Sequence, residues 1–435
     1  MDAFEASANV PRGDFEFDRR AATDQAFENA LGKARAGDRL DVDDAIELLT
    51  TGTDADGYDP DRKEAVLAAA DRRRADNVTT ACNTGCLFCN FKDRSEKFRT
   101  DYQDDHGGFT KTPAESRATV RDAIERGVYE VCSVSGLHPA LALNDEHREI
   151  LAASDRGDLN YRPPEEYEVD PATYVAQIEA MAVDGVHVHS MTPEEAYHAR
   201  RGTDWSYEEV FRRLKAAGLD SVPGTAAEIL VDEVREVICP AKIDTAEWLD
   251  AMEAAAAVGL DTTATIMYGH VDNEAHRALH LDRVRELQDR TGAITEFVPL
   301  SFVHEETPLA DRGVVEAGAS RHEDELMVAV ARLFLDNVDH IQSSWVKYGD
   351  AQGLKMLNCG ADDFMGTILS EEITKRAGGD NGEFRSVREY VDMITAIGRV
   401  PIERSTDYED RRRIDPDADT VGPALGPKAD GTPLV

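Results

Sequence analysis

Short β-rich runs alternate with amphipathic helical segments along most of this chain, and this alternation constrains the fold more than any other feature. The helical segments, such as YEEVFRRLKAAG, carry apolar residues at helical spacing and end in glycine just ahead of the next run. Eight such units predict an α/β protein with a (β/α)8 TIM-type barrel, more than an open doubly wound sheet. No GxGxxG follows the first run, which weakens a dinucleotide-binding alternative. The predicted strands are NVTTA (77–81), YEVCSV (129–134), VHVHS (186–190), LDSVP (219–223), TTATIM (262–267), TEFVPL (295–300), HIQSSW (340–345) and KMLNC (355–359).

The barrel is expected to occupy the middle of the chain. Polar helical patterns such as DDAIELL precede it, and the polar stretch 144–174 is typical of an insertion after the second strand. Beyond Arg404 the chain is rich in Asp, Pro and Gly, a composition that buries little apolar surface. We therefore predict a helical N-terminal extension over 1–70, the barrel core over 71–375, a C-terminal helical segment over 376–410 and a loosely ordered acidic tail over 411–435.

The formal charge of -38 comes from acidic residues spread along the whole chain, with only 11 lysines among the 48 basic residues. This pattern indicates adaptation of the entire surface to high salt, as in a haloarchaeal-type acidic proteome, and it argues against nucleic-acid binding. No stretch approaches the roughly 20 apolar residues of a membrane span, and the N-terminus lacks the apolar centre of a signal peptide. We expect a cytoplasmic protein that does not bind membranes.

Three of the six cysteines, Cys82, Cys86 and Cys89, form C-x3-C-x2-C directly after the first predicted strand. A structural zinc site usually needs four ligands in two paired groups, and no second pair follows. Three thiolates on one tight loop are suited to three irons of a 4Fe–4S cluster, which leaves the fourth iron open to a reactant. A zinc knuckle and a plain electron-transfer centre are the alternatives.

Polar and reactive residues follow the predicted strands, where barrel enzymes carry their chemistry. The loops after strands two to five contain SGLHP, His189 with Ser190, PGTAAE and MYGH, and the loops after strands six and eight contain SFVHEETPL and NCGADD. Because the carboxyl ends of parallel strands share one rim, we expect these loops to surround one site.

The cysteine spacing and its place after strand one resemble those of the radical S-adenosylmethionine (SAM) enzymes. Longer stretches resemble the second subunit of FO synthase, the tyrosine-utilising family of deazaflavin (coenzyme F-420) biosynthesis, from about residue 25 to about 410. The resemblance implies that SAM chelates the open iron, that a radical breaks the Cα–Cβ bond of L-tyrosine, and that the 4-hydroxybenzyl group couples to C5 of 5-amino-6-(D-ribitylamino)uracil. FO synthase subunit 1 would be the functional partner, with an unidentified electron donor. These stretches are GLDSVPGTAAEIL (218–230), EVICPAKI (236–243), TTATIMYGHV (262–271), TEFVPLSFVHEETPL (295–309), IQSSWVKYG (341–349), LNCGADDFMGT (357–367) and GRVPIERSTDY (398–408).

The same resemblance suggests roles for individual side chains. The backbone at Ser135 and Gly136 would meet the amino group of SAM, and Thr225, Glu228 and His189 would contact SAM or polar groups of the substrate. A substrate hydroxyl, the uracil or a transferable proton would be met by Tyr268, His270 and His304, and Glu296 would accept hydrogen bonds from an amine or a ribityl hydroxyl. Asn358 and Asp362 are further candidates, although Asp362 also suits a turn or helix cap.

One departure from the family pattern bears on SAM binding. The family usually has Gln-Gly-Gly ahead of the LHP-like stretch, whereas this chain has Val134, Ser135 and Gly136. The closest rival families are the radical SAM synthases of the futalosine menaquinone route, but GTAAE and FVPLSFVHEETPL favour the tyrosine-utilising branch. The other FO synthase subunit fits less well because its loop after strand six differs. A non-enzymatic iron–sulfur scaffold would not need the polar rim.

Overall fold

A computed structural model describes residues 24–50, 86–88, 113–125, 127–135, 137, 171–201, 203–305, 307–366, 368 and 385–418. Six parallel strands pair in the order in which they occur along the chain. This order requires a crossover between each pair of neighbours, and helices supply it, as the predicted barrel demands. The strands are β1 (Glu130–Ser133), β2 (His187–Ser190), β3 (Ser221–Val222), β4 (Asp261–Tyr268), β5 (Ile294–Ser301) and β6 (His340–Ile341).

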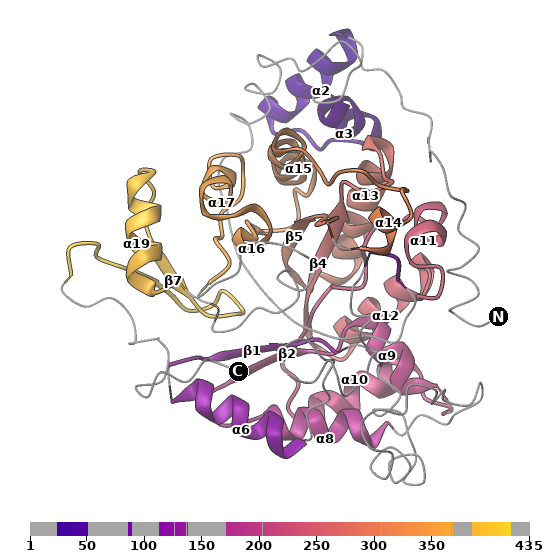
Figure 1. The fold of residues 1–435 in the computed structure, drawn as a ribbon, viewed down its shortest axis with the longest axis vertical. Helices are drawn as coiled ribbons and strands as arrows, with labels where there is room; N and C mark the ends of the chain where they lie inside the picture. The colour runs from indigo at the N-terminus through magenta and orange to yellow at the C-terminus, as the bar shows by residue number, and fades with distance from the viewer. Residues whose placement is uncertain are drawn as a thin grey trace.

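Helices flank this sheet on the outside of the curved strand array (Figure 1). Several begin with side-chain caps that the sequence makes available: Asn273 closes a capping box at α13, and Ser320 does so at α15. Gly292 ends α13 in the left-handed conformation (φ 62°), which glycine adopts without steric cost. The helices are α6 (Pro113–Ile124), α8 (Ala172–Met181), α9 (Pro193–Arg200), α10 (Tyr207–Ala216), α11 (Asp232–Ile238), α12 (Thr245–Ala257), α13 (Glu274–Thr291), α14 (Pro308–Asp311), α15 (Arg321–Phe334), α16 (Trp345–Tyr348) and α17 (Asp350–Met356).

The two faces of β4 separate the core from the barrel interior. Ala264 and Ile266 are fully buried, and on the paired strand Phe297 packs against His280 of α13 at 6.1 Å between ring centres. On the opposite face Thr265 donates a hydrogen bond to the carbonyl of Gly224. Side chains alternate between faces along a strand, so the interior is polar while the layer under the helices is apolar.

A strand forms within each of the six predicted runs from 129 to 345, although in HIQSSW (340–345) it ends at Ile341 and Trp345 begins α16. The eighth predicted strand, KMLNC (355–359), is wrong. Its first residues end α17, and the remainder forms a turn. A short apolar run does not distinguish strand from helix, because either can bury it. Instead, Gln342 at the end of β6 forms a parallel bridge with Asp363. The first predicted strand, 77–81, lies outside the described residues.

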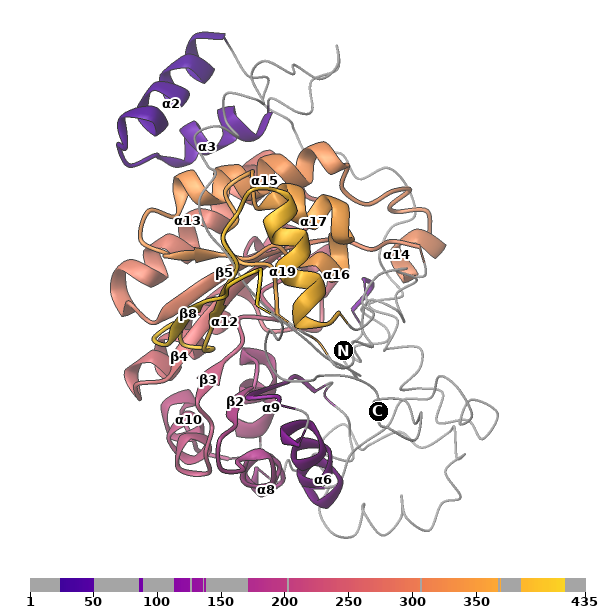
Figure 2. The same cartoon turned by 90° about the vertical axis from the view of Figure 1, so that its left-hand side faces the viewer.

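Elements from both ends of the chain pack on this array. Helices α2 (Asp24–Ala36) and α3 (Val42–Leu49) lie at one end of the molecule beside α13 and α15, opposite α6 and α8 (Figures 1 and 2). The helix expected at DDAIELL is therefore confirmed as α3. Near the C-terminus, α19 (Val387–Ala396) is followed by an antiparallel hairpin that the sequence analysis did not predict, β7 (Ile402–Arg404) and β8 (Arg411–Arg413). None of the helices in the described part of the chain has the length and apolar character needed to span a membrane.

Candidate functional site

The part of the cysteine loop that the structure describes is Cys86, Leu87 and Phe88, and the side chains of Cys86 and Leu87 are buried. Backbone hydrogen bonds hold the loop on two sides. The amide of Leu87 donates to the carbonyl of Ile238 at 2.8 Å, and the amide of Leu309 donates to the carbonyl of Leu87 at 2.9 Å. The loop is thus fixed between the end of α11 and the start of α14. The predicted site residues outside the described ranges are Cys82, Cys89 and Gly136.

A buried ion pair lies against this loop. Nζ of Lys242 is 2.6 Å from Oε1 of Glu228 and 5.7 Å from the centre of the Phe88 ring. Burial lowers the pKa of Lys242, but the charges of Glu228 and of Cys86 raise it, and the net shift is upward. The carbonyl of Glu228 also accepts a 2.6 Å hydrogen bond from the amide of Met267. The cysteine loop and a charged lysine therefore meet at the carboxyl end of β4.

The hydroxyl of Thr225 is buried in the loop after β3 and has no hydrogen-bond partner among the described residues. The loop lies hard against β4, since a Cβ at Gly224 would come 2.1 Å from the carbonyl oxygen of Thr263. Glu228 in the same loop has a φ of 47°, a conformation that costs energy for any residue with a Cβ. Buried hydroxyls are normally paired. The unpaired hydroxyl of Thr225 therefore leaves a hydrogen-bonding group available to a bound polar molecule.

Ser135, just after β1, donates hydrogen bonds from its backbone amide and from its side chain to a glutamate on α9. The amide donates to Oε1 of Glu195 at 2.9 Å, and Oγ donates to the same oxygen at 2.5 Å. Glu195 also closes the capping box of α9 with Thr192. Because the serine side chain ties the loop to α9, it holds the loop where the family has a glycine.

Tyr268 and His270, which follow one another closely at the end of β4, have buried partners outside the barrel interior. The hydroxyl of Tyr268 donates to Oδ1 of Asp324 on α15 at 2.8 Å and lies 3.1 Å from the hydroxyl of Tyr348. Burial raises the pKa of Asp324 to about 7, although the hydrogen bonds from Tyr268 and Ser301 lower it. Tyr268 therefore faces the helix layer.

The ring of His270 is used by the backbone of its own turn. Nδ1 accepts from the amide of Val271 at 2.8 Å, so Nε2 carries the proton and donates to the carbonyl of Met267 at 3.1 Å. Asp272 holds the same turn by accepting from the amides of Gly269 and His270. Burial lowers the pKa of His270, which keeps the ring neutral. This histidine shapes the turn after β4.

His304 lies in the loop after β5, and 26% of its side chain is exposed. Its Nδ1 is 3.4 Å from Oε2 of Glu305, and its carbonyl accepts hydrogen bonds from the amide and the hydroxyl of Thr307. The loop is anchored at its backbone while the imidazole stays accessible. Of the two histidines after β4 and β5, His304 is therefore the one with an exposed imidazole.

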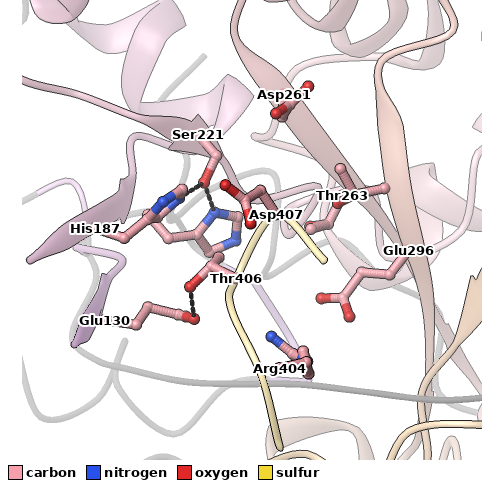
Figure 3. Close-up of a pocket in the computed structure, with 11 residues that line it drawn as sticks. Glu130, His187, Ser221, Asp261, Thr263, Glu296, Arg404, Thr406 and Asp407 are labelled. Carbon is pink, nitrogen blue, oxygen red and sulfur yellow. Dashed lines mark hydrogen bonds between the residues drawn. The ribbon is translucent and has the colours of Figure 1, made fainter. Parts of the chain in front are cut away.

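Glu296 and His189 lie at the opposite end of the sheet, in a cavity lined by the first residues of several strands (Figure 3). Nδ1 of His189 is 2.7 Å from Oγ of Ser221, and burial lowers its pKa to about 4. Glu296 accepts a 2.7 Å hydrogen bond from the hydroxyl of Tyr408 in the C-terminal hairpin. The cavity thus lies at the amino end of the strands, away from the cysteine loop. Its lining is Glu130, His187, His189, Ser221, Asp261, Thr263, Thr295, Glu296, Arg404, Thr406 and Asp407.

Asn358 and Asp362 are held by arginines. Asp362 accepts from Arg332 at 2.7 Å and lies 3.1 Å from Nδ1 of His340, while Asn358 accepts from Arg399 at 3.1 Å. These contacts tie the chain after α17 to its neighbours.

Two residues of the rim were not singled out from the sequence. Lys242 belongs to the stretch EVICPAKI. Lysine is rare in this chain, and this one stands among mostly apolar residues, a pattern from which a buried functional lysine could have been predicted. Glu195 stands three residues after Thr192, which is the spacing of a capping box. That local role explains the residue type, so the sequence gives no sign of its hydrogen bonds with Ser135.

Two family descriptions match the chain. Residues 77–284 match the radical SAM superfamily, and residues 291–416 match the CofH/MqnC C-terminal region. The chain is 76% identical to the 5-amino-6-(D-ribitylamino)uracil–L-tyrosine 4-hydroxyphenyl transferase of Haloarcula marismortui, over 99% of this chain and 98% of the relative. It is 69% identical to the protein of the same name from Halobacterium salinarum, over 97% and 96%. Identity to the Methanoculleus marisnigri protein of that name is 40%, over 87% and 96%.

Solved structures with the same fold are far more distant in sequence. HydG, a maturase of the [FeFe]-hydrogenase, superposes with a TM-score of 0.58 at 15% identity, covering 94% of this chain and 79% of that one. Methylornithine synthase superposes with a TM-score of 0.57 at 15% identity, covering 85% and 96%. The likeness supports the expected barrel fold.

Proposed function

Because this chain belongs to the radical SAM superfamily and, within it, to the family of 5-amino-6-(D-ribitylamino)uracil–L-tyrosine 4-hydroxyphenyl transferases, we propose that it transfers the 4-hydroxybenzyl group of L-tyrosine to that uracil. The chain is an enzyme of the transferase class, and its relatives' names supply the two substrates. The observation that carries the proposal is that Lys242 pairs with Glu228 of the GTAAE loop and lies over Phe88 of the cysteine loop, at the carboxyl end of β4. Barrel enzymes carry out their chemistry at that end.

We propose that Cys82, Cys86 and Cys89 hold a 4Fe–4S cluster and that SAM binds beside it. When bound, the two groups supply a 5'-deoxyadenosyl radical that starts the cleavage of tyrosine. The described residues support this placement: the chain around Cys86 is fixed by backbone hydrogen bonds on two sides, and the ammonium group of Lys242 lies over Phe88. A fixed loop keeps the geometry of a bound group constant, and a nearby cation favours thiolate over thiol.

The residues around the cysteine loop are suited to holding small polar molecules. The unpaired hydroxyl of Thr225 is a hydrogen-bond donor for SAM, and Glu228 accepts from Lys242 beside it. Ser135, tied to Glu195, fixes the backbone through which it and Gly136 would meet the amino group of SAM. His304 is proposed to move a proton at the substrate, because its imidazole is accessible.

The other predicted site residues are proposed to position the loops and strands around the site, without touching the substrate. Tyr268 and His270 set the position of the loop after β4, since their polar atoms are bonded to Asp324 and to the backbone. Glu296 and His189 stabilise the amino end of the barrel interior. We further propose that FO synthase subunit 1 uses the product, that an electron donor reduces the cluster, and that the reaction takes place in the cytoplasm.

Anaerobic reconstitution with iron and sulfide in molar potassium chloride tests the proposal. With SAM and reductant, we expect 5'-deoxyadenosine to form when L-tyrosine is added and a coupled product to form when the uracil is added as well. A Cys86→Ala variant is the matched negative control. Formation of 5'-deoxyadenosine without any coupled product would contradict the assigned acceptor, and absence of SAM cleavage by the wild type would contradict the radical reaction.

A further inference from the structure

Gln342 is a glutamine at the carboxyl end of β6 and is completely buried. Its backbone N–H donates to the carbonyl of Phe297 on β5 at 2.9 Å, and its backbone forms a parallel bridge with Asp363. The backbone of Gln342 is therefore held on both sides within the sheet, which fixes the direction of its side chain.

That direction is into the barrel. His340, two residues earlier and so on the same face, stacks on Tyr408 with 3.8 Å between ring centres. The hydroxyl of Tyr408 contacts both Glu296 at the cavity and Asp363, the partner of Gln342 in the bridge. The side chain of Gln342 thus lies on the interior face, one step nearer the carboxyl end than the His340 layer.

Neither Nε2 nor Oε1 of Gln342 has a hydrogen-bond partner among the described residues. The neighbouring Asp363 is fully paired by contrast, since it accepts from Arg404, Tyr408 and the amide of Met365. Leaving both ends of a buried carboxamide unpaired is unfavourable. The interior therefore contains an adjacent hydrogen-bond donor and acceptor, Nε2 and Oε1 of Gln342, that a bound molecule could pair with.

The chemistry of that partner follows from the amide. A carboxamide offers an N–H donor beside a C=O acceptor and carries no charge, so it matches a neutral ring edge with an adjacent C=O and N–H. The ammonium and carboxylate groups of an amino acid would instead call for charged partners. In a uracil, C2=O and N3–H form such an edge, opposite the C5 position at which coupling occurs.

We propose that Gln342 binds the C2=O and N3–H edge of the acceptor uracil and so selects a pyrimidinedione as the substrate. The uracil lies in the barrel interior with C5 turned towards the carboxyl end, where the Cys86 loop lies. This inference rests on the proposed function and adds to it the residue that recognises the acceptor.

The test compares the wild type with Gln342→Leu in reconstituted enzyme, by steady-state kinetics of coupling. The leucine variant should raise KM for the ribitylaminouracil by about 10-fold or more, because the recognition hydrogen bonds are lost. KM for L-tyrosine and the tyrosine-dependent formation of 5'-deoxyadenosine should stay within about 2-fold. An acceptor methylated at N3 should be discriminated against by the wild type and not by the variant.

Gln352→Leu is the matched control. Gln352 is also a buried glutamine, but its Nε2 donates to the carbonyl of Arg321 at 3.0 Å on the helix layer. Gln352→Leu should lower the melting temperature and leave KM for the uracil unchanged. Gln342→Leu should leave the melting temperature of the substrate-free protein equal to that of the wild type or higher. An unchanged KM for the uracil in Gln342→Leu would overturn the inference alone. Failure of the wild type to couple tyrosine to the uracil would overturn the proposed function and this inference with it.

Discussion

Nζ of Lys242 lies 2.6 Å from Oε1 of Glu228, and only 8% and 13% of the two side chains are exposed. Glu228 stands in the loop after β3, and Lys242 stands between α11 and α12, where its Nζ is 5.7 Å from the centre of the Phe88 ring. Removing charges from water is costly, and the pair is stable only because each charge offsets the other. It therefore joins the loop after β3 to the chain between α11 and α12, beside the cysteine loop.

Lys242→Met should lower the free energy of unfolding by roughly 3–5 kcal/mol, because it leaves the Glu228 carboxylate buried and unpaired. Lys242→Met combined with Glu228→Gln should recover most of the loss. Chemical denaturation of the cluster-free protein in molar salt measures both. Arg290→Met is the control: its pair with Glu253 is exposed, and its loss should cost less than about 1 kcal/mol. Equal costs for Lys242→Met and Arg290→Met would contradict the account.

Ser135→Ala removes the Oγ donor to Glu195 and keeps the amide donor. The loop after β1 should be held less firmly, so the dissociation constant for SAM should rise by about 5-fold, which corresponds to about 1 kcal/mol. Equilibrium binding of SAM to reconstituted enzyme measures this constant. Ser206→Ala, which removes an N-cap at α10, should reduce stability alone. SAM affinity equal to that of the wild type in Ser135→Ala would rule out this role.

The pKa of Asp324 is raised by burial to about 7 from the ordinary value of 3.8. The folded protein thus binds a proton that the unfolded chain has already lost, so stability should fall as the pH rises from about 4 to about 7 and stay level above that range. The full change is on the order of 4 kcal/mol. Asp324→Asn should flatten this part of the curve, as measured by denaturation at several pH values. An unchanged pH dependence in the variant would exclude Asp324 as its source.

Glu296→Gln tests whether this residue acts on the substrate or on the fold. Tyr408 donates to it from the C-terminal hairpin, so the variant should lose roughly 1–3 kcal/mol of stability while kcat per folded enzyme stays within about 2-fold. Tyr408→Phe should show the same pattern, since it removes the hydroxyl and keeps the ring on His340. A fall in kcat of more than about 10-fold without loss of stability would assign Glu296 to the reaction instead.

The strand positions could be predicted because the alternation of β-rich and amphipathic segments is a local property of the chain. The structure of the run at 355–359 could not be predicted in this way, because a short apolar segment fits the end of a helix such as α17 as well as a strand. Side-chain direction was equally out of reach: a one-residue difference in strand register decides whether Tyr268 faces α15 or the interior.

Partners distant in sequence explain the other differences. Glu296 was predicted to accept hydrogen bonds from an amine or a ribityl hydroxyl, whereas it accepts one from Tyr408, which is 112 positions away. Lys242 and Glu228 are only 14 positions apart, yet their contact depends on how two irregular loops fold. Pairings of this kind depend on tertiary packing.

The transfer of the tyrosine side chain to the uracil is the central claim, and isotope labelling measures it directly. Reconstituted enzyme is supplied with SAM, reductant, the ribitylaminouracil and L-tyrosine carrying 13C in its ring and β-carbon, and the product is analysed by mass spectrometry. We predict one product that contains the labelled 4-hydroxybenzyl carbons joined to the uracil, with unlabelled ribityl carbons. A product without the label, or label released only as free 4-hydroxybenzyl compounds, would contradict the account.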